Sequence, residues 1–217
     1  MQAYLNIFLA WFLHLDTHLL ELVHVHGNGV YLILFAVIFI ETGVVIMPFL
    51  PGDSLLFIAG AVAAKGLLNP LSLFAILTCA AVSGDAVNFA VGTWFRRKTL
   101  DTSKIPFVKP EHLAQTHDFF KAHGGKTVIL ARFVPIVRTL APFVAALGAM
   151  PPRIFFTYNL IGAVLWIGGL LLAGYVFGGI PWVNHNLTVV VLGIVALSMM
   201  PAVIAWLRTR RASGARD

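Results

Sequence analysis

Residues 39–62, FIETGVVIMPFLPGDSLLFIAGAV, form an apolar stretch that PFLPG interrupts and that carries two acids, Glu41 and Asp53. The arm after the prolines, SLLFIAGAVAA at 54–64, would extend only roughly 16 Å as a helix, whereas a hydrocarbon core is about 30 Å thick. So short an arm predicts a re-entrant hairpin, whose tip must be buried in protein or line a wet cavity.

A second apolar stretch, ILARFVPIVRTLAPFVAALGAM at 129–150, is interrupted at Pro135 and Pro142 and carries Arg132 and Arg138. A charged side chain near the middle of a bilayer costs roughly 3 kcal/mol, so four unpaired charges would cost on the order of 10 kcal/mol. We therefore expect the two acids and the two arginines to meet one another, water or a charged ligand. Their placement on two broken segments predicts a transport site for an ionic substrate.

Composition places the chain among integral membrane proteins. Of its 217 residues, 59% are hydrophobic and only 11% are charged, and the mean hydropathy is +0.89. These values lie far outside the usage of soluble proteins. The formal charge of +6 does not indicate nucleic-acid binding, because the basic residues flank apolar spans instead of forming a basic domain.

Three further segments are long and apolar enough to cross a membrane, namely 71–95, 154–179 and 187–207. Between the first two lies the polar segment 96–126, which carries seven Lys or Arg residues and is therefore expected in the cytoplasm. Three full spans and a cytoplasmic C-terminus place the N-terminus outside. The arm at 30–47 is itself long enough to cross, which leaves a different count open.

The chain divides into three parts. Residues 1–27, with histidines and acids among apolar side chains, predict an interfacial amphipathic helix. Residues 28–207 form the membrane domain, and residues 208–217 form a basic cytoplasmic tail. No cysteine accompanies the histidines, so we expect neither a metal site nor a cofactor.

Both halves of the membrane domain follow one plan, a proline-broken hairpin followed by a long span, and the hairpins enter from opposite faces. FIAGAV after Pro51 is echoed by FVAALGA after Pro142. The expected fold is an all-α polytopic membrane protein. Its two oppositely oriented re-entrant helical hairpins and its transmembrane helices form an inverted repeat, as in many transporters.

Four motifs give the chain a close resemblance to the bacterial DedA family, whose members share the VTT or SNARE-associated domain. They are ETG...PFLPGDSLLF at 41–57, GDAVNF at 84–89, HGGKTVILARFVPIVRTLAPFVAALGAM at 123–150 and YNLIGAVLW at 158–166. The resemblance implies a multi-pass protein of the bacterial cytoplasmic (inner) membrane that handles lipid. It also implies dependence on the proton-motive force, movement of undecaprenyl phosphate or phospholipid, and a role in envelope homeostasis and cationic peptide resistance.

The acids and arginines treated as essential in that family match Glu41, Asp53, Arg132 and Arg138. A buried carboxylate such as Glu41 suits proton coupling, although it could instead only neutralise an arginine or cap backbone groups. Asp53 follows Pro51 and Gly52 and opens a helix, so an N-cap role competes with coupling.

The two arginines suit a lipid phosphate, because a guanidinium fork matches phosphate oxygens bidentately and stays charged. The alternative is a static quartet in which two negative and two positive charges cancel. Four other polar residues, Asp85, Asn88, Tyr158 and Asn159, are expected either to bridge helices by hydrogen bonds or to line the pathway.

The leading hypothesis is a proton-coupled lipid flippase, with Arg132 and Arg138 binding the phosphate and Glu41 and Asp53 carrying protons. Undecaprenyl phosphate is the favoured cargo by resemblance, and a phospholipid such as phosphatidylethanolamine is an alternative. Rival hypotheses are a small-cation or drug proton antiporter and a scaffold that transports nothing. An enzyme such as a lipid phosphatase is not expected, because no nucleophile–base set is present. The assembly state stays open, with a homodimer as one alternative.

Overall fold

The computed structural model describes residues 15–44, 52–101 and 124–181, together with residues 183, 189, 190 and 193. Within these ranges the regular structure is entirely helical, which confirms the all-α prediction. The elements in chain order are α2 (Leu15–His26), the 3-10 helix η1 (Gly27–Gly29), α3 (Val30–Gly43), α4 (Gly52–Ala64), α5 (Pro70–Asp101), α7 (Lys126–Ala131), α8 (Pro135–Leu147) and α9 (Pro152–Phe177).

Three helical stretches are long and apolar enough to cross a membrane, namely Leu19–Gly43, Pro70–Lys98 and Pro152–Phe177. The last two confirm the predicted spans in α5 and α9. Most of the third predicted span, 187–207, and the whole tail at 208–217 lie outside the described residues. The stretch Leu19–Gly43 begins inside the segment predicted to lie at the interface.

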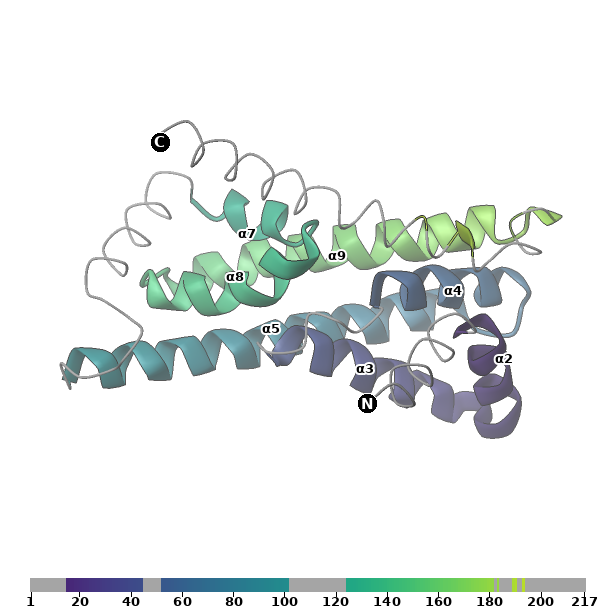
Figure 1. Ribbon diagram of the computed structural model, residues 1–217, viewed down its shortest axis with the longest axis horizontal. Helices are drawn as coiled ribbons and strands as arrows, with labels where there is room; N and C mark the ends of the chain where they lie inside the picture. The colour runs from purple at the N-terminus through teal and green to yellow at the C-terminus, as the bar shows by residue number, and fades with distance from the viewer. Residues whose placement is uncertain are drawn as a thin grey trace, which may run out of the picture.

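The chain changes direction between α2 and α3. Gly27 has a φ of 52°, a left-handed conformation that glycine adopts without a Cβ clash. Figure 1 shows α2 turned away from the axis of α3. The interfacial role of residues 1–27 stays a prediction, and only residues 15–27 of that segment are described.

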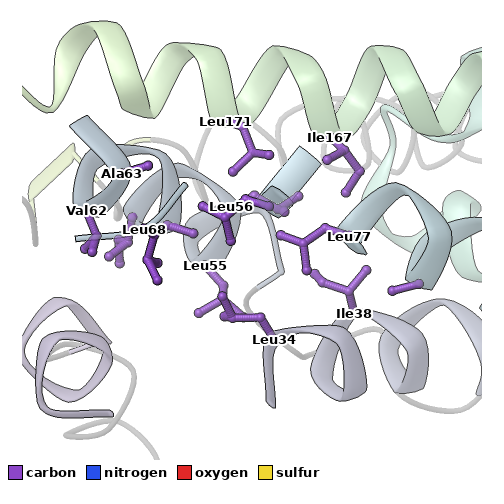
Figure 2. Packing of buried hydrophobic residues seen from close by; sticks show 14 of the residues in the cluster. Leu34, Ile38, Leu55, Leu56, Val62, Ala63, Leu68, Leu77, Ile167 and Leu171 are labelled. Carbon is purple, nitrogen blue, oxygen red and sulfur yellow. The ribbon is translucent and has the colours of Figure 1, made fainter. Parts of the chain in front are cut away.

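The two long helices α5 and α9 form the scaffold of the fold (Figure 1). α3 and α8 pack against α5, whereas α4 and α7 pack against α9. The core between α3, α4, α5 and α9 is built of branched apolar side chains, which Figure 2 shows meeting from all four helices. The labelled members include Leu34, Ile38, Leu55, Leu56, Leu77, Ile167 and Leu171.

Two glycines let the backbones of α4 and α9 approach closely. A Cβ at Gly60 would overlap the carbonyl of Leu171, and a Cβ at Gly174 would overlap the carbonyl of Phe57. Helices in membranes associate through close packing of this kind, because lipid chains are as apolar as leucine. This close packing sets the position of α4 along α9, and it therefore also sets the position of the first residues of α4.

The first broken segment returns to the end from which it started. α3 ends at Gly43 and α4 begins at Gly52, and the backbone N–H of Asn69 after α4 donates a hydrogen bond to the hydroxyl of Tyr31 in α3 at 2.8 Å. The far ends of α3 and α4 therefore lie together at one end of the molecule.

The second broken segment also consists of two helices, α7 and α8, and it lies toward the other end of the molecule. Val134 is extended, with φ −114° and ψ 108°, and separates α7 from α8. Gly125 before α7 lies against the ring of Tyr158 near the start of α9. Figure 1 shows α3 and α4 reaching the middle of the molecule from one end and α8 reaching it from the other. The membrane depth of these segments and the inverted repeat stay predictions.

The second segment is broken once within the described residues, and not at both prolines as predicted. α8 continues through Pro142 to Leu147. A proline inside a helix removes one backbone hydrogen bond but does not always end the helix. Here Pro142 has no N–H to donate to the carbonyl of Arg138, four residues earlier, and packing of α8 against α5 holds the helix together.

Candidate functional site

Arg138 joins the two acids of the first broken segment. Its Nη2 lies 2.8 Å from Oε1 of Glu41, and its Nη1 lies 2.6 Å from Oδ1 of Asp53. Arg138 and Glu41 are buried, with exposed side-chain fractions of 5% and 1%, and Asp53 is partly buried, at 15%. Arg138 stands in the first turn after the proline that opens α8, so the break in the chain directs it at the ends of α3 and α4.

Asp53 lies one residue inside α4, because the helix begins at Gly52. The carboxylate of Asp53 thus stands in the first turn of α4, and its N-cap role stays a prediction. Gly52 itself makes room for the other acid, because a Cβ at that position would overlap the carboxylate of Glu41. The Pro-Gly-Asp motif thus brings the start of α4 directly against Glu41.

Arg132 takes a different acid from the one expected. Its Nη1 lies 2.8 Å from Oδ2 of Asp85 on α5 and donates to Oδ1 of Asn159 on α9 at 2.6 Å. The same nitrogen is 3.3 Å from the backbone carbonyl of Asn159. The predicted quartet of two acids and two arginines is therefore incomplete, and Asp85 is a fifth charged member.

Trp166 lies beside both arginines. The Cζ atoms of Arg138 and Arg132 lie 4.4 Å and 5.5 Å from the centre of the Trp166 ring. The face of an indole ring attracts cations. Nε1 of Trp166 donates a hydrogen bond to Oδ1 of Asp53 at 2.8 Å. Our sequence interpretation missed this residue. Its position seven residues after Asn159 puts both on one face of α9, and this spacing could have identified it.

Of the other predicted polar residues, Asn88 bridges helices by hydrogen bonds and Tyr158 packs against apolar neighbours. Nδ2 of Asn88 donates to the backbone carbonyls of Thr42 at 3.2 Å and Thr139 at 2.7 Å, so it links α5 to both α3 and α8. Tyr158 packs on Gly125 and on the apolar cluster around Phe155. Whether either residue lines a pathway stays a prediction.

A cavity of about 180 Å³ opens at the centre of this arrangement. Its polar lining comes from Asp53, Arg132, Arg138 and Trp166, and its apolar lining comes from Phe133, Leu165, Gly169 and Leu170. Among the described residues, no group of three His, Cys, Asp or Glu side chains is placed to hold a metal ion. The site is therefore an ionic cluster beside a small cavity whose lining is mostly apolar.

The formal charges of the cluster do not cancel. Three carboxylates, on Glu41, Asp53 and Asp85, face two guanidiniums, on Arg132 and Arg138. With every group ionised, three negative and two positive charges leave −1. A buried cluster of that charge is costly, so the arrangement favours the uptake of one proton or one cation.

The fold and this site define a multi-pass helical membrane protein with an ionic centre between its helices. The VTT domain model matches residues 50–176, and Protein DedA of Escherichia coli (strain K12) is 49% identical over 203 residues, which are 93% of each chain. The chain belongs to the DedA family of bacterial membrane proteins. This finding confirms the resemblance drawn from the motifs.

More distant relatives agree. An uncharacterized membrane protein of Mycobacterium leprae (strain TN) is 38% identical over 169 residues, covering 78% of this chain and 76% of its own. The inner membrane protein YghB of Escherichia coli (strain K12) is 33% identical over 157 residues, covering 72% of each chain. No solved structure matches the chain.

Proposed function

We propose that the protein is a proton-coupled transporter that moves a phosphate-bearing lipid between the leaflets of the bacterial cytoplasmic membrane. The observation that supports this best is the cavity in which Asp53, Arg132 and Arg138 meet beside Trp166. A phosphate headgroup crosses hydrocarbon only when its charge is met on the way. Guanidiniums in a dry site can supply that charge, because they stay ionised and are weakly hydrated.

The acids supply the coupling in this proposal. Asp53 lines the cavity and shares Arg138 with Glu41, so an anion bound there is repelled by the two acids while both are ionised. Binding of a phosphate is favoured when one of the acids is protonated, and release of that proton favours release of the phosphate. Proton flow down its gradient then drives the lipid in one direction.

The two broken segments support a transporter of the inverted-repeat kind. The outer ends of the first segment meet through Asn69 and Tyr31, those of the second meet in the cluster of Val128 and Met150, and the inner ends of both meet at Arg138. We propose that they are re-entrant hairpins from opposite membrane faces, with the ionic cluster at the midplane. In this topology the N-terminus lies outside and the C-terminus lies in the cytoplasm.

Undecaprenyl phosphate is the cargo that the DedA resemblance favours, with phosphatidylethanolamine as the alternative. The test is reconstitution of the purified protein in vesicles that contain either lipid in labelled form. Exchange between leaflets is then followed with and without a pH gradient. Transport of one labelled lipid that accelerates with the gradient supports the proposal, and no exchange above that of protein-free vesicles overturns it.

One observation favours a second candidate, a cation/proton antiporter. The cluster carries one more carboxylate than guanidiniums, and this excess could hold a small cation instead of a proton. The same vesicles without labelled lipid, loaded with a cation-sensitive dye, separate the two functions. Cation flux against a pH gradient in the absence of lipid exchange would establish the antiporter.

A further inference from the structure

The two arginines differ in which of their nitrogens are already used. Arg138 donates through both terminal nitrogens, Nη1 to Asp53 and Nη2 to Glu41. Its Nε alone has no hydrogen-bond partner among the described residues. The end of its guanidinium is therefore occupied by two carboxylates, and a bidentate contact with a further anion requires one of them to leave.

Arg132 is held through one terminal nitrogen only. Nη1 makes the polar contacts of this side chain with the described residues, namely with Asp85 and with the side chain and carbonyl of Asn159. Nε and Nη2 have no hydrogen-bond partner among the described residues, although the side chain is only 3% exposed. The N–H groups of these two nitrogens form the side edge of the guanidinium, which is one of its bidentate forks.

Unpaired donors in so buried a side chain indicate a missing ligand. A buried N–H without a partner costs free energy comparable to a lost hydrogen bond. Arg132 also lines the cavity of about 180 Å³ that opens beside Trp166. The unpartnered donors and the cavity therefore belong to the same arginine, although both nitrogens are themselves covered by neighbouring atoms.

The partners of Nη1 are themselves fixed by the helices that carry them. Oδ1 of Asn159 can face Arg132 only while Nδ2 faces the opposite way, and Nδ2 lies 3.4 Å from the carbonyl of Val82 on α5. Asp85, one turn further along α5, reaches the same nitrogen with Oδ2. The two helices α5 and α9 therefore clamp the guanidinium in one orientation.

We propose that Arg132 is the residue that binds the phosphate oxygens directly, through Nε and Nη2, and that Asp85 and Asn159 are its positioning residues. The inference rests on the proposed function and assigns a different role to each of its two arginines. Arg138 holds the coupling acids Glu41 and Asp53, whereas Arg132 recognises the anion. The ligand chemistry is a phosphate with at least two free oxygens, on a lipid or as the free ion.

The test compares binding of dodecyl phosphate and of inorganic phosphate to the purified full-length protein in a maltoside detergent, by isothermal calorimetry. The variants are Arg132→Lys, Arg138→Lys and Asn159→Leu. Phe155→Leu is the matched control, because Phe155 is fully buried one turn away on α9 and packs on Phe89 outside the site. Each variant is also scored for its unfolding temperature.

We expect wild-type protein to bind dodecyl phosphate, and Arg132→Lys and Asn159→Leu to weaken that binding about tenfold or more, the equivalent of a lost charged hydrogen bond. Arg138→Lys should weaken it less than either. In the vesicle assay, Asn159→Leu should raise the half-saturating lipid concentration more than it lowers the maximal rate. Phe155→Leu should lower the unfolding temperature without changing the affinity, and so separates misplacement of Arg132 from general destabilisation.

Several outcomes would overturn the inference. These are no binding of either phosphate by wild-type protein, unchanged affinity in a folded Arg132→Lys protein, or a greater loss in Arg138→Lys than in Arg132→Lys. If Arg132→Lys does not fold, Asn159→Leu decides alone. Binding as predicted without leaflet exchange would instead remove the proposed function and leave the phosphate site standing. Stronger binding of inorganic phosphate than of dodecyl phosphate would assign the site to the free ion.

Discussion

Nε1 of Trp166 donates a hydrogen bond to Oδ1 of Asp53 at 2.8 Å, and the same oxygen accepts a hydrogen bond from Nη1 of Arg138 at 2.6 Å. One carboxylate oxygen therefore connects the start of α4 to α8 and α9 together. The indole also lies against both guanidiniums. Asp53 is thus held by its neighbours in a single orientation toward the cavity.

Trp166→Phe removes this hydrogen bond and keeps an aromatic face beside the arginines. A hydrogen bond to a charged group contributes about 1.5–3 kcal/mol, so we expect a lower unfolding temperature and slower lipid exchange. Trp166→Ala should lower both further, because the cation–π contacts are lost as well. Thermal unfolding in detergent and the vesicle assay measure the two effects. Equal behaviour of the phenylalanine variant and wild type would show that the Asp53 contact is dispensable.

Arg138→Ala leaves Glu41 and Asp53 without their shared cation. Breaking a buried ion pair from one side costs about 3–5 kcal/mol, so we expect a large loss of stability or of expression. Adding Glu41→Gln and Asp53→Asn to that variant should restore stability but not transport. Arg138→Lys should still fold, but it should transport lipid slowly. An ammonium cannot reproduce the planar fork that reaches both acids. Near-normal transport by Arg138→Lys would favour a static ion pair.

The sequence was sufficient to predict the helical membrane class, two segments long and apolar enough to span, and that the acids Glu41 and Asp53 need a charged or polar partner, with an arginine as one of the alternatives. Those predictions follow from hydropathy and from the cost of burying charge. The partner of Arg132 could not be derived in this way, because Asp85 and Asn159 come from two further helices whose rotation about their axes depends on packing. Trp166 was missed because a tryptophan in an apolar helix is usually a packing residue, although its spacing from Asn159 places both on one face of α9. Pro142 shows the converse, because a helix break expected from the residue type was overridden by contacts with α5.

Gly174→Ala should separate α4 from α9. The added Cβ would overlap the backbone carbonyl of Phe57, which cannot swing away as a side chain end can. We expect a lower unfolding temperature, and slower transport because α4 carries Asp53. Gly179→Ala, where a Cβ would meet nothing within 4 Å, is the control. A Gly174→Ala protein as stable as its control would show that α4 and α9 do not need this close approach.

The opposed hairpins can be tested by labelling two exposed residues with a membrane-impermeant maleimide. Leu67 follows the first broken segment and Arg153 follows the second. In a Cys79→Ala background, Leu67→Cys should react from outside the cell and Arg153→Cys only after the membrane is opened. Reaction of both from one side would mean that the second broken segment crosses the membrane fully, because only α5 and that segment separate the two sites, and the inverted-repeat proposal would fail.

Glu41→Gln tests the proposed coupling role of the most deeply buried acid of the cluster. The amide oxygen can still accept the hydrogen bond from Nη2 of Arg138, which now spans 2.8 Å to Oε1, so the protein should insert and fold. The side chain can no longer lose or gain a proton, and the formal charge of the cluster changes from −1 to zero. We therefore expect leaflet exchange that no longer responds to an imposed pH gradient, although some exchange without a gradient persists. Asp53→Asn, made in parallel, asks whether the less buried acid has the same role. A Glu41→Gln protein that accelerates with the gradient as wild type does would exclude Glu41 as the coupling residue and leave Asp53 and Asp85 as the candidates.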